Sequence, residues 1–263
     1  MTFWRGVRMI ALSLVTALMV ASPNAMAHPE DEFCALDGGL DPALCRALQD
    51  LDRADGTSGG DQFSQTETID FERPALETFG LYVKIGIQHI LPGGSDHILF
   101  VLALVFSTRG FRPLLIQVSA FTVAHTMTLA MVASGVFAPP ASLVEPLIAA
   151  TIAFVAIENL VFKDMTRWRP FVVFLFGLIH GMGFAGFFGS LGLPDGQFWS
   201  ALIGFNVGVE IGQIAVIVFA AILLSPLRSM WTQARFRHLI VWPACGAIGL
   251  IGAFWTVERL LAG

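Results

Sequence analysis

Six hydrophobic stretches follow one another from Phe79 to the C-terminus, and they limit what the chain can fold into more than any other feature. They cover residues 79–107, 113–137, 143–162, 170–190, 198–224 and 239–262. A helix of about 20 apolar residues crosses the hydrocarbon core of a bilayer. The mean hydropathy of +0.71 is too high for a soluble domain. We therefore expect residues 78–263 to form an all-α polytopic membrane bundle of about six spans.

The first 27 residues have the layout of a cleavable secretory signal peptide. Arg5 and Arg8 precede an apolar run over residues 9–20, and the small residues Ala25 and Ala27 end the segment. Such a segment is removed from the mature protein and is excluded from the fold. The alternative is an uncleaved additional span.

Residues 28–77 are acidic, with 13 of the 20 acidic residues of the chain. This composition indicates a solvated extracytoplasmic segment, and residues 41–56 within it predict one short helix. Cys34 and Cys45 lie near the start of that helix, and in an oxidising exterior they either form a disulfide or stay free. Cys245 lies in an apolar stretch and is expected to be buried and unreactive.

Basic residues mark alternate loops between the predicted spans. Cytoplasmic loops are enriched in Lys and Arg, and the intervening loops here contain neither. The mature N-terminus is therefore expected outside (periplasmic), at a bacterial inner membrane, as the signal peptide also requires. The basic loop residues are Arg109, Arg112, Lys163, Arg167, Arg169, Arg228, Arg235 and Arg237.

Ionisable side chains recur near the middle of the predicted spans. A charged or strongly polar group at the bilayer centre costs several kcal/mol unless it is paired or hydrated, so such residues are functional candidates. The alternative for each is a hydrogen bond that bridges two helices. The candidates are His89, Asp96, His97, His125, His180 and Glu210.

The stretch "HILPGGSDHILF", from His89 to Phe100, predicts an interrupted first span. Pro92 and the Gly93–Gly94 pair break a helix, and Ser95 is the expected N-cap of its second half. Non-helical backbone inside a membrane is tolerated where it is buried in protein or lines a hydrated cavity. Transporters use such half-helix ends to hold ions.

Small residues at intervals of four predict close helix packing in the fourth and fifth stretches. Asn206 and Gln213, with Thr122 beside His125, are candidates to orient the metal ligands. Glu145 and Glu158 either mark the two ends of a cation path or are a solvated and an ion-paired residue. The small residues are Gly177, Gly181, Ala185, Gly189, Gly204, Gly208 and Gly212.

Imidazoles with one or two carboxylates and no thiolate suit a divalent transition metal: nickel, zinc, cobalt, copper(II) or iron. Nickel and zinc are the leading candidates. The ligand types alone do not choose between them.

Several blocks in one order resemble the HupE/UreJ family of bacterial membrane proteins. They are "GIQHILPGGSDHILFVLAL", "FTVAHTMTLA", "VEPLIAATIAFVAIENL", "FGLIHGMGFAG" and "FNVGVEIGQ", from about Gly86 to Gln213. Ile90 and one extra residue before Asp96 are similar to the broader second branch of the family. The family is associated with hydrogenase and urease accessory systems and is regarded as nickel permeases. By resemblance, the six midplane residues would be its polar membrane residues. The expected partners are the metal ion and the lipid bilayer, and the sequence does not identify metalloenzyme maturation partners.

Three functions fit these features. The leading hypothesis is a divalent metal permease, and the second is an intramembrane zinc-dependent hydrolase with Glu210 or Asp96 as general base. The third is a metal-free structural or accessory subunit. The sequence contains no ATP-binding loop and no basic patch for nucleic acid.

Overall fold

The computed structural model describes residues 74–108, 110–162, 166–184 and 196–262. Within these residues every regular element is a helix, which confirms the predicted all-α membrane architecture. The predicted signal peptide, nearly all of the acidic segment, and the Cys34 and Cys45 pair lie outside the described residues.

Four helical stretches are long and apolar enough to cross a membrane. Three are α6 (Phe111–Ala133), α7 (Ala141–Val161) and α10 (Phe198–Met230). The fourth is the C-terminal stretch, made of α11 (Gln233–Phe236), the five-residue π-helix η1 (Arg237–Val241) and α12 (Trp242–Ala262).

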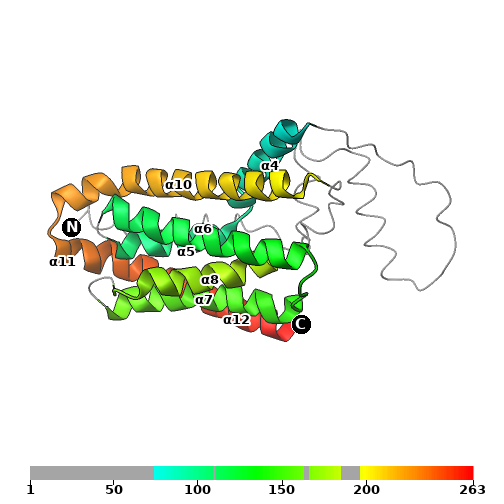
Figure 1. Ribbon diagram of the computed structural model, residues 1–263. Coiled ribbons are helices and arrows are strands. Elements are labelled where there is room, and N and C mark those ends of the chain that lie inside the picture. Colours follow the sequence, from blue (N-terminus) through cyan, green and yellow to red (C-terminus); the bar gives the residue numbers. More distant parts are fainter. Residues whose placement is uncertain (1–73, 109, 163–165, 185–195, 263) are drawn as a thin grey trace.

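The first predicted span is broken into α4 (Ala75–Ile90) and α5 (Ser95–Ser107), which are bent by 72°. Figure 1 shows α4 leaning out of the bundle. The interruption at Pro92–Gly94 is thus confirmed, but the N-cap is Gly94 and not Ser95. Gly94 N–H closes the turn on the Ile90 carbonyl at 3.2 Å, so the second helix begins at Ser95 itself.

The fourth predicted span is described only in part. Its helix, α8 (Arg169–Gly183), has 15 residues. At 1.5 Å per residue it is about 22 Å long, shorter than the roughly 30 Å hydrocarbon core. The described residues thus contain four candidate spans, or five if the bent pair α4–α5 is one span, and the count of six stays a prediction.

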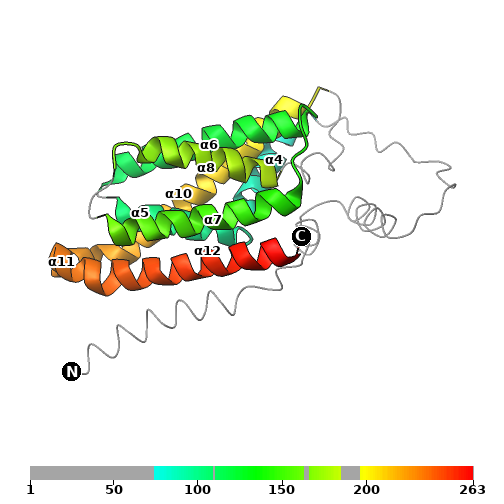
Figure 2. The ribbon, with the colours of Figure 1, turned by 90° about the horizontal axis from the view of Figure 1, so that it is seen from below.

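The helices form three closely packed pairs around α5. The pairs are α4 with α10, α6 with α8, and α7 with α12, while α5 contacts α4, α6, α7, α10 and α12. Figures 1 and 2 show α5 inside the bundle. Its side chains are buried on several sides, which fits a helix that is apolar all round.

Each pair is joined at a glycine where the two backbones touch. A Cβ added to Gly208 of α10 would overlap the Val83 carbonyl of α4, and one added to Gly181 of α8 would overlap the His125 carbonyl of α6. Gly252 of α12 meets the backbone of Ala153 in α7 in the same way. Of the predicted small-residue ridges, Ala185 and Gly189 lie outside the described residues. Cys245 is a buried free thiol, as predicted.

Candidate metal centre

Three helix ends converge on the histidines. His89 lies in the last turn of α4, His97 is the third residue of α5, and His180 lies in the last turn of α8. The C-terminal end of a helix carries a partial negative charge that favours cations. Two such ends, from α4 and α8, therefore bring their histidines to one place, and His125 joins them from the middle of α6.

His97 stands at the centre of the four rings. Its ring centroid lies 4.9 Å from that of His89, 5.1 Å from that of His180 and 6.0 Å from that of His125. His89, His97 and His125 each offer one ring nitrogen, and the three lie within 4.8 Å of one another. Metal–nitrogen bonds near 2.1 Å place two ligands at most about 4.2 Å apart, so a small inward rotation of the rings would close the site. His180 is a neighbour of this group rather than a member.

Asn206 of α10 sets the protonation of His125. Asn206 Nδ2 donates to the Leu202 carbonyl at 2.8 Å, so its Oδ1 accepts from His125 Nδ1, 3.0 Å away. The proton of the neutral ring is then on Nδ1, and His125 Nε2 keeps its lone pair. This is the arrangement by which an outer hydrogen bond prepares an imidazole for a metal.

Thr151 of α7 sets the protonation of His180 in the same manner. The Thr151 hydroxyl donates to the Ile148 carbonyl at 2.7 Å and therefore accepts from His180 Nε2 at 2.9 Å. The lone pair of His180 is then on Nδ1. Thr151 was not among the sequence-predicted residues, because threonines in membrane helices commonly bond their own backbone.

The nitrogens of the cluster that face away from these partners have no hydrogen bond. Among the described residues, the buried atoms without a partner include His89 Nε2, His97 Nε2, His125 Nε2 and His180 Nδ1. A buried polar atom left unpaired costs about 1 to 3 kcal/mol. Four of them in one cluster indicate a site that awaits a ligand, and a cation would satisfy the lone pairs.

Phenylalanines enclose the cluster. Phe121 and Phe100 pack against His180 at 5.0 and 5.3 Å, and Phe184 packs against His89 at 4.3 Å. Phe205 stacks on Phe184 at 4.6 Å. These rings exclude water and lower the local dielectric, which strengthens electrostatic interactions inside. Sequence reasoning missed them, although Phe121 and Phe184 lie one helical turn from a histidine.

Asp96 is engaged outside the histidine group. Arg259 of α12 donates to both of its carboxylate oxygens, at 2.8 and 3.1 Å. Arg259 also donates to the backbone carbonyl of Glu145 at 3.2 Å, while the Glu145 side chain is exposed. The predicted ligand Asp96 and the predicted path residue Glu145 therefore meet at Arg259, which joins α5, α7 and α12.

Glu210 is held between α6 and α10. Ser119 donates to its Oε1 at 2.8 Å and Thr122 donates to its Oε2. Thr122 also lies 3.1 Å from Gln213 Oε1. Glu210, Thr122 and Gln213, all singled out in the sequence, form a polar seam with Ser119 beside the cluster rather than a part of the three-nitrogen group.

Glu158 lies near the end of α7, far along the helix from Glu145. Thr166 donates to its Oε1 at 3.3 Å, and Arg169 forms an ion pair with it at 3.7 Å. The ion-paired alternative considered for Glu158 is thus the one that the geometry shows.

The comparisons with known proteins agree with this architecture. Residues 65–259 match the family described as HupE / UreJ protein. The chain belongs to the HupE/UreJ family. No curated protein and no solved structure matches it. The family is linked to metal handling, and the three-histidine group of this member fits a divalent transition metal with imidazole ligands.

Proposed function

We propose that this membrane protein is a permease for a divalent transition metal of the nickel type, which carries the ion through the histidine cluster. One observation carries the proposal: His89, His97 and His125 can each offer a ring nitrogen within 4.8 Å of the other two. In addition, among the described residues each of these rings has a buried Nε2 without a hydrogen-bond partner. The distribution of basic loops supports an orientation with the mature N-terminus outside. We propose that the protein lies in the inner membrane and that the ion passes from the outside to the cytoplasm.

The polar seam supplies the next step of the path. Along α6 the order Ser119, Thr122, His125 leads to the cluster, and along α10 Glu210 follows Asn206 by one turn. At 1.5 Å per residue, that turn moves an ion about 6 Å from the histidines to a carboxylate. The direction is toward the start of α6, on the side predicted to be cytoplasmic.

The charge of the ligand set and the contacts of the two carboxylates support the choice of transport. Three neutral imidazoles bring no negative charge to the ion, so the site has less electrostatic hold than one with thiolates or carboxylates. The hydrolase considered as the alternative would use Asp96 or Glu210 as its general base. Asp96 is bound to Arg259, and Glu210 is bound to Ser119 and Thr122.

The test is His97→Ala, with His238→Ala as the matched control. His97 is the central ring of the cluster, whereas His238 is exposed and packs on Trp242. We expect loss of His97 to weaken nickel binding at least about a hundredfold, since even outer partners of ligands are worth 10- to 100-fold. Radioactive nickel uptake should fall to the background of cells without the protein.

The control should take up nickel within twofold of the wild-type rate. Membrane levels of the three proteins are compared by immunoblot. Equal uptake by wild type and His97→Ala, at equal levels in the membrane, would refute the proposed function.

A further inference from the structure

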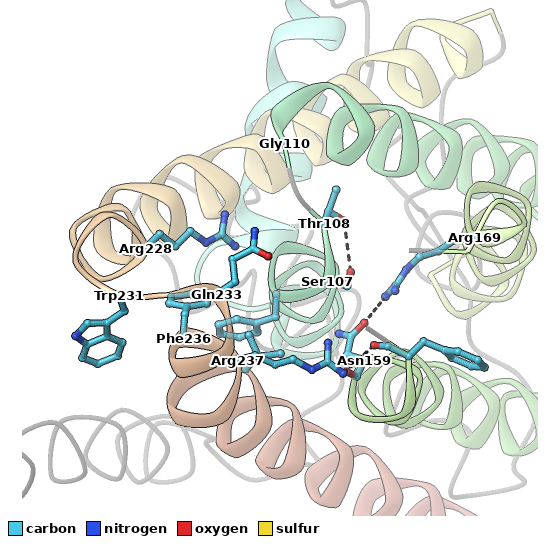
Figure 3. Close-up of a pocket in the computed structure, with 13 residues that line it drawn as sticks. Ser107, Thr108, Gly110, Asn159, Arg169, Arg228, Trp231, Gln233, Phe236 and Arg237 are labelled. Atoms are coloured by element: carbon cyan, nitrogen blue, oxygen red, sulfur yellow. Dashed lines mark hydrogen bonds between the residues drawn. The ribbon is translucent and has the colours of Figure 1, made fainter. Parts of the chain in front are cut away.

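A second polar site lies at the end of the bundle where α5, α7 and α10 end and α6 and α8 begin. It is a pocket of about 420 Å³. Its polar lining includes Arg169, Arg228, Arg237, Asn159, Thr108 and Gln233, and no described lining residue is acidic. Figure 3 shows Arg228 and Arg169 entering from opposite sides.

Arg169 is a buried cation whose donors are only partly used. It is 2% exposed. Its Nη2 donates to Asn159 Oδ1 at 2.8 Å, and its Nη1 lies 3.7 Å from Glu158. Its Nε is buried and has no hydrogen-bond partner among the described residues. An unsatisfied donor on a buried charge is expensive, which points to an acceptor that belongs there.

Arg228 brings a second positive charge with no carboxylate beside it in the described part of the chain. Its Nη2 donates to the Val105 carbonyl at 3.1 Å, and its guanidinium lies 5.2 Å from the Phe236 ring centroid. Arg237 is anchored on the last carbonyls of α7, with bonds of 3.0 Å to Asn159 and 2.9 Å to Phe162. Three guanidinium groups therefore line the pocket, and Glu158 pairs with Arg169 from behind it.

We propose that this pocket binds a phosphate group. Guanidinium groups match the oxygens of a phosphate with paired N–H donors, and several around one pocket neutralise its double charge. The apolar part of the lining, with Phe106, Phe162 and Trp231, also suits the carbon portion of a phospholipid. Free inorganic phosphate and an anionic lipid headgroup share this chemistry, and the experiment separates them.

The depth of the pocket agrees with this ligand. Helix α10 has 33 residues. It is therefore about 50 Å long, roughly 20 Å more than the hydrocarbon core. Arg228 lies near its last turn, beyond the apolar part of the helix, where lipid phosphates are found. Basic pockets between membrane helices on the cytoplasmic side bind anionic headgroups.

The experiment uses the full-length protein in detergent with two probes. Native mass spectrometry measures retention of dioleoyl phosphatidylglycerol, with dioleoyl phosphatidylcholine for comparison, and calorimetric titration measures binding of inorganic phosphate. We expect Arg228→Gln to lower the affinity for whichever probe binds about tenfold, which corresponds to about 1.4 kcal/mol. Arg112→Gln is the matched control, because it removes the same charge from an exposed site at the start of α6.

Gln233→Glu is a second variant, at an exposed position of the lining, and it should abolish binding by placing a carboxylate in the pocket. Thermal unfolding of both variants verifies that they are folded. If the protein retains phosphatidylglycerol but not phosphatidylcholine and does not bind inorganic phosphate, the ligand is an anionic lipid. If calorimetry shows binding of inorganic phosphate, the ligand is the free anion. Failure of the wild type to bind either probe, or equal binding by wild type and both variants, overturns the proposal without touching the proposed metal path.

Discussion

The histidine cluster and the arginine pocket are both polar sites in an apolar bundle. The cluster has acceptor atoms without donors, whereas the pocket has a donor without an acceptor among the described residues. In the cluster, His125 and His180 keep lone pairs that receive no hydrogen bond. In the pocket, Arg169 keeps an Nε donor that has no acceptor in the part of the chain that the structure describes. The cluster is therefore complementary to a cation and the pocket to an anion.

The carboxylates near the two sites are each bound by another side chain. A carboxylate close to the three ring nitrogens would hold a cation more strongly, yet Asp96 and Glu210 are bound by groups on other helices. Glu158 does not line the arginine pocket but pairs with Arg169 from behind it. The anionic side chains thus set the net charge of each site from a short distance instead of filling it.

The largest expected effect that separates the two sites comes from Gly181→Ala. The added Cβ would overlap the His125 carbonyl and the Thr128 hydroxyl, so α6 and α8 must move apart. Overpacking of this kind costs up to about 3 kcal/mol, and the displacement of His125 should lower nickel affinity. Thermal unfolding and a nickel titration measure the two effects.

Gly246→Ala is the control for that substitution, since its Cβ would meet nothing within 4 Å. It should leave stability unchanged or raise it by about 0.5 to 1 kcal/mol. Phosphate binding should be unchanged in both proteins. Loss of phosphate binding in Gly181→Ala would mean that the two sites are one cooperative unit.

A smaller effect is expected for Asn206→Leu, which removes the acceptor that fixes the His125 proton on Nδ1. Nickel affinity should fall about tenfold, at the lower end of the range for such partners. Asn206→Asp keeps an acceptor and should restore most of the affinity. Competition with a chromophoric chelator measures the nickel affinity of the wild type and both variants. An unchanged affinity in the leucine variant would show that Asn206 does not orient His125.

The smallest effect is expected for Asp96→Asn, because Asp96 is paired with Arg259. Nickel affinity should change by less than about threefold, and the partly exposed ion pair should contribute about 1 kcal/mol or less to stability. Arg259→Gln should behave alike, and the double variant should lose no more than either single one. A hundredfold loss of nickel affinity in Asp96→Asn alone would return this residue to the ligand set.

The parts predicted from sequence depend on local patterns. Hydropathy located the spans, the Pro92–Gly94 break located the bend, and spacing of glycines such as Gly208 located the helix contacts. The histidines were singled out because polar residues at mid-span are costly. Each of these signals lies within one helix or one turn.

The parts that sequence did not yield depend on contacts between distant segments. Asp96 and Arg259 are 163 positions apart, and nothing local indicates their pairing. Arg169 and Arg228 were interpreted only as markers of the cytoplasmic side, because a loop charge gives no sign that it is buried in a pocket. The start of α5 differed from expectation by one residue because the turn is closed by backbone hydrogen bonds.

The bend between α4 and α5 also has an electrical consequence. α4 and α5 meet at the cluster. If the site lies at mid-membrane, as proposed from the sequence, an ion that enters it would have crossed about half of the transmembrane field. A full crossing is worth about 2.3 kcal/mol per charge at 100 mV, so a divalent ion at half depth gains about 2.3 kcal/mol. An inside-negative potential would therefore raise occupancy of the histidines from the outside roughly 50-fold. The membrane potential would thereby raise the apparent affinity of the site for ions that enter from the outside.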